Sequence, residues 1–285
     1  MENLLPDEND VRFYKENGYW IGPKFLSDEE LEAVRDRHAR IVAGVYETGR
    51  SPWWREPAAG EPLKRVVKVD NSYWTDSVIA KLTLHPIIGV MAARLSESKC
   101  IRLWHDELLL KPPGIGAVGN IGWHQDYQYW QCTDPPSLLT AWIALDDVDE
   151  ENGCMQVVPE SHKCGLLSDG NFHEHDLERL KRKFEERMGM PFVTHKCIIP
   201  AGSVSFHHCL TIHGSGPNRS EHSRRSHVIH LQPEGVRYKP GTPSDTHMNV
   251  TLNGGLDGSP FIGPYFPVLY REGERANPWL CFENR

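Results

Sequence analysis

The first third of the chain has apolar positions at helical spacing. Residues 27–45 carry such a pattern, and Ser27 and Glu30 form the S-x-x-E pair of a capping box at its start. The residues that define its inner face are Leu31, Val34, His38, Ile41 and Val45. The stretch LHPIIGVMAARL predicts a second helix with Pro86 in its first turn. We expect both helices to pack on the domain rather than to carry chemistry.

The pattern changes near residue 100, where short β-favouring runs are separated by Gly, Pro, Asn and Asp. These runs are CIRLWHDELLLK, SLLTAWIALDDV, MQVVPE, KCIIPAGSVSFHH and RSHVIHLQPEGV. Many short strands with turn residues between them predict a sandwich or barrel. The charged stretch HEHDLERLKRKFEERMG predicts a solvent-facing helix between two strands, and the Pro- and Gly-rich tail after residue 240 predicts irregular structure over the core.

No internal repeat and no convincing domain boundary interrupts these patterns. We therefore predict one domain over residues 1–285, mainly β with added helices. It would comprise a helical N-terminal part at about 1–98, a β core at about 99–235 and an irregular tail at about 236–285.

Composition narrows the class of protein further. The net charge is −8 with no long run of one sign, which disfavours nucleic acid as a partner because duplex binding needs a basic stripe. We see no basic, apolar leader and no run of about 20 apolar residues, so we expect a cytoplasmic protein without a membrane partner. The seven cysteines, Cys281 among them, are scattered and never spaced C-x-x-C, which predicts reduced thiols. Oligomeric state is not readable.

The stretch GWHQDYQYW holds the first candidate chemistry. If it is a strand end, His124 and Asp126 share one face while Gln125 points elsewhere. One imidazole and one carboxylate are two of the three donors of an Fe(II) oxygenase site, which uses two histidines and one carboxylate. An H-x-D pair alone is a weak signal, so a third donor from a distant strand is needed.

The best source of that third donor is SFHHCLTIHGSGPNRSEHSRRSHVIHLQ. His213 is the first choice because it precedes Gly214, where a strand gives way to a turn that can face a cavity. The residues alone leave His207 and His208 as competitors. Weaker candidates are His222, His227 and His230. The arginines that follow are suited to bidentate pairing with a dicarboxylate cosubstrate: Arg219, Arg224 and Arg225.

The ordered motifs HQD, TAWIALDDVDEENGCMQVVPESH and AGSVSFHHCLTIHGSGPNRSEHSRR resemble the phytanoyl-CoA dioxygenase family of Fe(II)- and 2-oxoglutarate-dependent oxygenases. The opening FYKENGYWIGPKFLSDEELEAV is also similar to that family's N-terminal helix, strand and helix, so the resemblance covers most of the chain. It implies a double-stranded β-helix core, the jelly-roll or cupin-like fold, with the H-x-D strand end and the distal histidine at one open mouth.

The resemblance also implies roles for single residues. His124, Asp126 and His213 match the iron triad. Arg224, eleven residues beyond His213, matches the arginine that binds the distal carboxylate of 2-oxoglutarate, and it is preferred to its neighbour. Trp142 and Gln125 match positions near the cosubstrate, although Trp142 also fits an ordinary core aromatic. A turn motif of structural rather than catalytic role comprises Asn152, Gly153, Pro159, Ser161 and His162.

The implied activity is that of a dioxygenase that uses Fe(II), 2-oxoglutarate and O2 to oxidise a small organic molecule, with release of succinate and CO2. Halogenases of this broad group replace the carboxylate ligand by a small residue. Asp126 is present, so hydroxylation is expected, or another oxidation such as desaturation or ring formation. The alternatives are a metal-dependent jelly-roll enzyme that does not use 2-oxoglutarate and a noncatalytic small-molecule binder.

The substrate is not identified by the sequence. Aromatic residues that could line its pocket, or equally belong to the core, are Trp53, Trp54, Tyr73, Trp74, Trp123, Tyr127, Tyr129 and Trp130. A loose group of basic residues keeps an anionic substrate open, although such charges are more often a solvated face: Arg50, Arg55, Lys64, Arg65 and Lys68.

Overall fold

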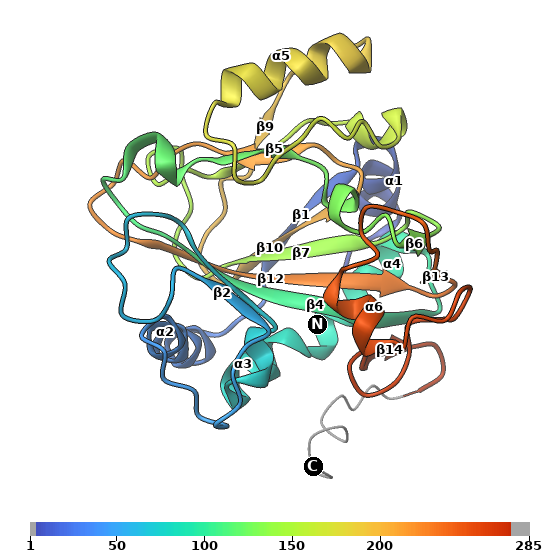
Figure 1. Ribbon diagram of the computed structural model, residues 1–285, viewed down its shortest axis with the longest axis horizontal. Helices are drawn as coiled ribbons and strands as arrows, with labels where there is room; N and C mark the ends of the chain where they lie inside the picture. The colour runs from blue at the N-terminus through green and yellow to red at the C-terminus, as the bar shows by residue number, and fades with distance from the viewer. Residues whose placement is uncertain (1–3, 275–285) are drawn as a thin grey trace.

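The computed structural model describes residues 4–274 (Figure 1). Its N-terminal part contains α1 (Glu8–Asn17), β1 (Tyr19–Lys24), α2 (Asp28–Val42), β2 (Trp54–Glu56), β3 (Val67–Asp70), the 3-10 turn η2 (Ser72–Trp74), α3 (Ser77–Thr83) and α4 (Pro86–Ser96). Both predicted helices are confirmed, but α2 ends at Val42, so Val45 lies beyond it and is exposed rather than on its inner face. The hydroxyl of Ser27 and the carboxylate of Glu30 form the expected capping box on α2, and Pro86 is in the first turn of α4.

The rest of the chain is rich in strands. They are β4 (Cys100–Lys111), β5 (Ile121–His124), β6 (Thr133–Asp134), β7 (Leu139–Ala144), β8 (Met155–Val157), β9 (His195–Lys196), β10 (Ser203–His208), β11 (His213–Ser215), β12 (Arg224–Pro233), β13 (Arg237–Tyr238) and β14 (Val268–Arg271). Between them lie α5 (Leu177–Met188), α6 (Met248–Leu252) and the 3-10 turns η3 (Gly116–Gly119), η4 (Asp126–Tyr129) and η5 (Ser161–Cys164).

Two antiparallel sheets face each other. The larger has eight strands in the order β1-β10-β7-β12-β4-β3-β2, with β14 also paired to β4, and the smaller has the order β5-β11-β8-β9. In Figure 1 the smaller sheet lies above the larger one, with α5 at the top. Two facing antiparallel sheets of this kind confirm the jelly-roll prediction. This topology brings strands distant in sequence to one interior space.

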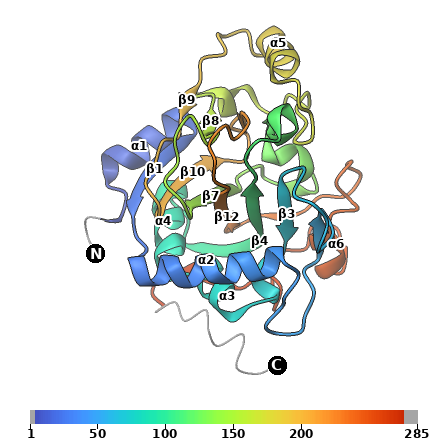
Figure 2. The ribbon, with the colours of Figure 1, turned by 90° about the vertical axis from the view of Figure 1, so that its left-hand side faces the viewer.

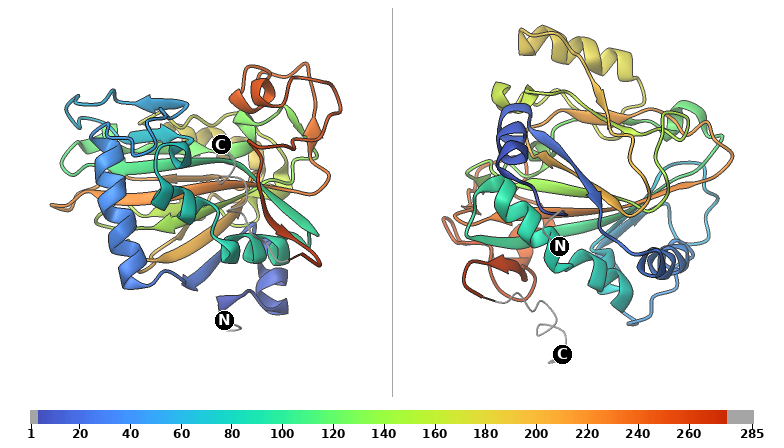
Figure 3. Two further views of the ribbon diagram at one scale, coloured as in Figure 1. Left: turned by 90° about the horizontal axis from the view of Figure 1, so that it is seen from below. Right: turned by 180° about the vertical axis from the view of Figure 1, so that it is seen from behind.

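Helices cover the outer face of the larger sheet. Figures 2 and 3 show α2, α3 and α4 beneath it, where fully buried side chains such as Ile41, Ile79 and Leu95 pack against Leu103 and Ile229 of the strands. Burying these side chains supplies the main favourable free energy of folding. The helices therefore form the floor under the sheet, and the opposite face is free to line a cavity.

The stretch Ser77–Ser96, with a mean hydropathy of 1.5, meets the length and composition of a membrane span, which the sequence analysis did not expect anywhere. In the structure this stretch is two helices, α3 and α4, separated at Leu84 and His85. Of its most apolar window, 61% is buried inside the protein. The core helices of water-soluble proteins pass the same test, so this single match is weak support for a membrane span.

Two expectations about the ends of the chain are corrected. The N-terminal part is not only helical, because β1 extends the larger sheet at one edge and β2 and β3 extend it at the other. The tail is not wholly irregular, because β14 pairs with β4 and α6 forms a short helix. These strands contain six residues or fewer, too few to show a clear two-residue period.

The predicted charged helix is confirmed as α5, but it is not wholly solvent-facing. Leu180 and Phe184 on one side of α5 are buried with Trp123 and Phe192. The helix therefore covers the outer face of the smaller sheet, on the strand that ends at His124.

Candidate active site

Three predicted metal ligands converge between the two sheets. His124, the last residue of β5, is paired directly with His213, the first residue of β11, and their ring centroids are 4.2 Å apart. Asp126 begins η4, and its Oδ1 is 3.5 Å from the Nε2 atoms of both histidines. One ligand atom from each residue lies within 4.8 Å of the others. This spacing suits one shared metal ion at bond lengths of about 2 Å.

Backbone carbonyls orient the two imidazoles. Nδ1 of His124 is 2.7 Å from the carbonyl of Gly122, and Nδ1 of His213 is 3.0 Å from the carbonyl of Thr211. Because a carbonyl oxygen only accepts, each Nδ1 must carry the hydrogen and each Nε2 keeps its lone pair. Both lone pairs are therefore available for a metal.

The carboxylate is oriented in the same way. The hydroxyl of Thr140 donates to Oδ2 of Asp126 over 2.7 Å, and Nε2 of His207 is 3.2 Å from the same oxygen. These contacts occupy Oδ2 and leave Oδ1 facing the two histidines. Such outer contacts hold metal ligands in place before the metal binds. Thr140 and His207 were not assigned this role from the sequence.

Protonation states match the same function. Burial acts to raise the pKa of Asp126, but the neighbouring imidazoles of His213, His124 and His207 hold it well below its ordinary value. Burial first, and then His207 and His124, lowers the pKa of His213 well below its ordinary value. The set is thus an ionised carboxylate with a neutral imidazole, the forms that bind metal.

The competing histidines lie in different places. His207 contacts Asp126 from beside the triad, and its ring centroid is 4.2 Å from that of His213. His208 instead accepts a hydrogen bond from the backbone of Leu210 through Nδ1. His227 is buried against Thr83 on the outer side of the sheet. The geometry therefore favours His213 as the third ligand.

A cavity of about 380 Å³ opens beside the triad, and Arg224 lies in its wall. This side chain is only 2% exposed, and its Nη1 donates to the carbonyl of Gly153 over 2.6 Å. Among residues 4–274 no carboxylate forms an ion pair with it, and its Nε has no hydrogen-bond partner. Burial lowers its pKa to about 10, so it stays cationic at neutral pH. A buried, unpaired cation is costly, and an anionic ligand would compensate it.

The neighbouring cations differ from Arg224. Arg225 makes a bidentate ion pair with Asp146, with contacts of 2.6 and 3.0 Å, and is therefore already neutralised. Lys111, opposite Arg224 on β4, is fully buried and donates to the hydroxyl of Ser215 over 2.6 Å. Burial first, and then Arg224, lowers the pKa of Lys111 well below its ordinary value. Lys111 was not among the site residues predicted from the sequence.

The two residues matched to the cosubstrate pocket have different positions. Trp142 lines the cavity, and the Arg224 guanidinium lies 5.2 Å from its ring centroid. Gln125 is not among the described residues that line the cavity. Its amide nitrogen donates to the carbonyls of Gly165 and Leu210, and its oxygen accepts from the backbone of Leu167. The side chain of Gln125 therefore links backbone segments of different loops. We do not include it among the proposed cosubstrate contacts.

The turn motif supports the site from outside. Gly153 has φ +76°, and a Cβ there would lie 2.6 Å from the carbonyl oxygen of Gly216, so only glycine fits. The hydroxyl of Ser161 accepts from the backbone of Ile212 over 2.9 Å, next to His213. The motif therefore positions the Gly153 carbonyl that accepts from Arg224 and the backbone that precedes His213. Both contacts agree with the structural role expected for the motif.

The predicted pocket aromatics divide into two groups. Those that line the cavity are Trp53, Trp54, Tyr129 and Trp130, joined by Phe172. Those that are buried in hydrophobic clusters instead are Tyr73, Trp74, Trp123 and Tyr127. Of the basic group, Lys68 lines this cavity, but it is already paired with Asp70 and Glu107. The basic residues therefore give little support to an anionic substrate.

Two facing antiparallel sheets that enclose two imidazoles and one carboxylate have the ligand set of non-haem iron oxygenases. The sequence model of the family Phytanoyl-CoA dioxygenase (PhyH) matches residues 14–226, and the chain belongs to this family of Fe(II)- and 2-oxoglutarate-dependent oxygenases.

Relatives agree with this assignment. A protein of Stutzerimonas stutzeri described as a probable alpha-ketoglutarate-dependent hypophosphite dioxygenase is 29% identical over 222 residues, which are 76% of each chain. The solved structure of the non-heme alpha ketoglutarate dependent carbocyclase SnoK from nogalamycin biosynthesis has 31% identity and a TM-score of 0.69, and the match covers 92% of this chain and 96% of that one.

The epimerase SnoN, solved in complex with Fe3+, alpha ketoglutarate and nogalamycin RO, has 26% identity and a TM-score of 0.68, with 92% and 98% of the two chains covered. The protein is therefore an Fe(II)/2-oxoglutarate-dependent dioxygenase that uses iron and 2-oxoglutarate and acts on a small molecule. The family assignment therefore excludes the two alternatives, an enzyme that does not use 2-oxoglutarate and a noncatalytic small-molecule binder.

Proposed function

We propose that this dioxygenase hydroxylates a small organic molecule and that His124, Asp126 and His213 are its iron ligands. The observation that carries the proposal is the convergence of two lone-pair-bearing Nε2 atoms and one carboxylate oxygen at the wall of a cavity. The unpaired guanidinium of Arg224 in that wall fits the distal carboxylate of 2-oxoglutarate.

Each side chain has a distinct part in the reaction. Iron and 2-oxoglutarate together, when bound, supply the oxidation of an unactivated C–H bond by O2. Thr140 and His207 hold Asp126 in its ligating orientation. Arg224 anchors the cosubstrate while Trp142 packs against the guanidinium. The aromatic wall keeps water from the reacting groups.

Asp126 supports hydroxylation over halogenation, because the carboxylate fills the position that halogenases of this broad group leave for chloride. The relatives are described with compounds as different as hypophosphite and nogalamycin. They support no single substrate for this chain. We also propose a cytoplasmic location; the six cysteines of the described chain are free thiols, which supports it, and Cys281 lies outside the described residues.

The proposal is tested without knowledge of the substrate. The metal-free protein is prepared without oxygen, Fe(II) and then 2-oxoglutarate are added, and the visible spectrum is recorded. We expect a weak charge-transfer band that requires both additions. Arg224→Ala should raise the 2-oxoglutarate concentration needed for half of the band by about tenfold or more, because it removes a buried charge-assisted pair.

Arg225→Ala is the matched control, because this neighbouring arginine is paired with Asp146 and should leave the cosubstrate titration unchanged. Circular dichroism verifies that both variants are folded. Equal effects of the two substitutions would contradict the role of Arg224. His213→Ala tests the assigned ligands. If this variant kept the charge-transfer band of the wild type, Fe(II) would be bound through other residues and the assignment would be wrong.

A further inference from the structure

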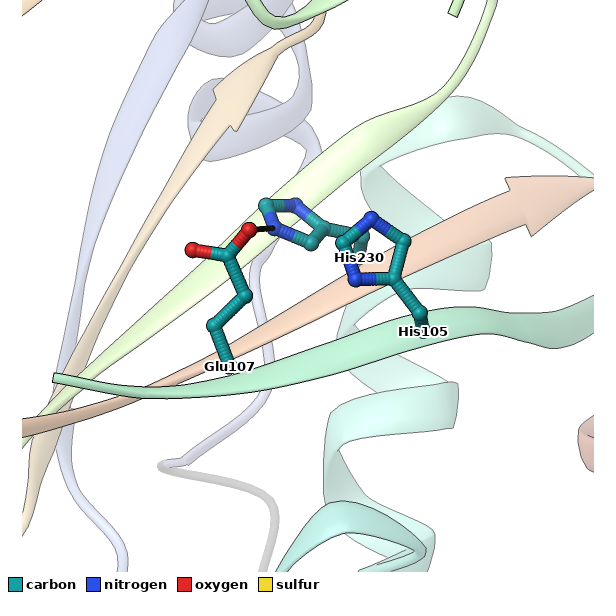
Figure 4. A group of neighbouring side chains, drawn as sticks. All are labelled: His105, Glu107 and His230. Atoms are coloured by element: carbon teal, nitrogen blue, oxygen red, sulfur yellow. Dashed lines mark ion pairs between the residues drawn. The ribbon is translucent and has the colours of Figure 1, made fainter. Parts of the chain in front are cut away.

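A second group of metal-ligand-type side chains lines the same cavity. His105 and Glu107 lie two residues apart on β4, and His230 lies opposite His105 on β12. Figure 4 shows the three side chains facing one another. Nε2 of His230 is 3.4 Å from Oε1 of Glu107, and the ring centroids of His105 and His230 are 4.4 Å apart. The proposed iron and cosubstrate contacts use none of the three, and we call them the second cluster.

His105 indicates that this cluster has a ligand. The residue is only 4% exposed, and neither of its ring nitrogens has a hydrogen-bond partner within residues 4–274. A neutral imidazole offers one N–H donor and one lone pair, and leaving both unsatisfied in a buried position is unfavourable. The ring lies in the cavity wall, where a bound molecule could satisfy it.

The hydrogen-bond chain through Thr140 shows which kind of ligand fits. The Thr140 hydroxyl has one hydrogen, which it donates to Asp126, so it must accept from Nδ1 of His230, 2.9 Å away. In the neutral ring, Nε2 of His230 then carries a lone pair. That lone pair faces Glu107, whose carboxylate is also an acceptor. Either a second proton on the ring or a ligand with hydrogen-bond donors resolves this contact between two acceptors.

The local charge balance favours a cationic donor. Lys68 pairs with Asp70 over 2.5 Å and with Glu107 over 2.8 Å, and all three line the cavity. Burial raises the pKa of Asp70, whereas Lys68 and His230 hold the pKa of Glu107 below its ordinary value despite its burial, so Glu107 is the carboxylate that stays ionised. Burial lowers the pKa of His247 to about 3 and that of His105 well below its ordinary value, so neither of these rings adds positive charge beside Glu107.

An ammonium group matches these features better than a metal ion does. A primary ammonium has three donors in a small volume, enough for two imidazole lone pairs and one carboxylate. A divalent ion at Glu107 would lie beside the Lys68 ammonium, which is 2.8 Å from the same oxygen that faces His230. The indole of Trp130, 4.6 Å from His230 between ring centroids, adds an aromatic wall of the kind that attracts cations.

We propose that the second cluster of His105, Glu107 and His230 binds a protonated amino group of the substrate and so directs the rest of the molecule toward the triad. This inference rests on the proposed function. It makes the substrate an amine-bearing small molecule rather than an acyl-CoA thioester.

The test uses cyclohexylamine as the probe and cyclohexanol as its neutral counterpart. Protein loaded with Zn(II) and 2-oxoglutarate cannot turn over, and binding is followed by calorimetry and by ¹⁵N-histidine NMR. We expect cyclohexylamine to bind at least about tenfold more tightly than cyclohexanol and to shift the His105 and His230 signals.

His105→Phe is the decisive variant, because it keeps a ring while removing two nitrogens that have no hydrogen-bond partner in the described part of the chain. It should weaken cyclohexylamine binding by about tenfold, and Glu107→Gln should do the same by removing the charge. Glu150→Gln, at a surface pair with Lys196, is the matched control and should change nothing. Zinc and 2-oxoglutarate binding verify that every variant retains the active site.

Three results would overturn the inference. The first is equal binding of cyclohexanol and cyclohexylamine. The second is amine binding that His105→Phe does not weaken. The third is a second zinc ion in the wild-type protein that persists in Asp126→Ala and is lost in His105→Phe, which would make the cluster a metal site. Failure of the proposed function would give a different result. In that case the charge-transfer band of iron and 2-oxoglutarate would be absent, whether or not cyclohexylamine binds.

Discussion

Two clusters of two histidines and one carboxylate share one cavity, yet their surroundings differ. Their internal distances are similar: nitrogen to oxygen is 3.5 Å in the triad and 3.4 Å in the second cluster. In the triad, backbone carbonyls hold both Nδ1 atoms, and Thr140 holds the carboxylate. In the second cluster, neither ring nitrogen of His105 has a hydrogen-bond partner among residues 4–274, and Glu107 is paired with Lys68. The outer contacts, rather than the donor types, therefore distinguish a metal centre from a ligand-recognition site.

The two clusters are also connected. Thr140 donates to Asp126 of the triad and accepts from His230 of the second cluster. A change in what His230 binds can thus alter the hydrogen bond that orients an iron ligand. We expect substrate binding and the iron environment to be coupled through this one hydroxyl.

The largest predicted effect tests the triad itself. His213→Ala should lower Fe(II) affinity by more than about 100-fold, since loss of a ligand exceeds the 10- to 100-fold effect typical of an outer contact. Affinity is measured by anaerobic iron titration with the 2-oxoglutarate band as the signal. His208→Ala is the control, because His208 lies on β10, which precedes β11 in the chain, and is outside the triad. Retention of tight iron binding in His213→Ala would mean that His207 is the third ligand.

An intermediate effect is expected at the link between the clusters. Thr140→Val keeps the shape of the side chain but removes the hydroxyl that orients Asp126, so Fe(II) affinity should fall by about tenfold. The same titration measures it. Thr75→Val is the control, because that buried hydroxyl donates to the carbonyl of Ser72 away from the cavity. An unchanged iron affinity in Thr140→Val would show that the two clusters are independent.

The smallest predicted effect concerns stability without ligand. His105→Phe should raise the free energy of unfolding by about 1 kcal/mol at pH 7.5, because it removes buried nitrogens that lack partners. His124→Phe in metal-free protein should instead lower it, since the Gly122 carbonyl loses its donor. Urea unfolding monitored by fluorescence measures both. Destabilisation by His105→Phe would mean that its ring nitrogens have partners in solution.

His105→Phe should also change the dependence on pH. Burial holds the pKa of His105 well below 6.5 in the folded protein, while in the unfolded chain it is about 6.5. Below pH 6.5 the unfolded state therefore binds a proton that the folded state does not, so the free energy of unfolding decreases as the pH is lowered. The variant should lose less stability than the wild type between pH 6.5 and 5, and a parallel loss would contradict the neutral state of His105.

Much of the triad could be predicted from the sequence because its geometry is local. His124 and Asp126 are separated by one residue in extended backbone, which turns both to one side and Gln125 to the other, as the structure has it. Thr140 was missed, and His207 was considered as a ligand rather than as a partner of Asp126, because both lie in strands that are buried almost throughout. Such strands show no alternation that would separate a cavity-facing polar residue from the core.

The second cluster left a usable signal, since His105 and Glu107 occupy alternate positions of an otherwise apolar run. Its third member could not be added, because the pairing of His230 with His105 depends on the register between β4 and β12. A shift of one residue would turn His230 to the other face of the sheet. Likewise, Lys111 becomes notable only when the same register places it beside Arg224.

Helical periodicity, turn residues and a one-residue spacing are properties of neighbouring positions, so the sequence alone was enough to predict the two long helices, the β-rich middle and the H-x-D pair. The jelly-roll core and His213 as the third donor were implied by the family resemblance. Packing alone settled which distant residues share the cavity and which of them already have partners. Arg224 is unpaired while Arg225 is neutralised, and His105 is unpartnered while His124 is held. These differences depend on strand register and burial, which arise from packing across the whole chain.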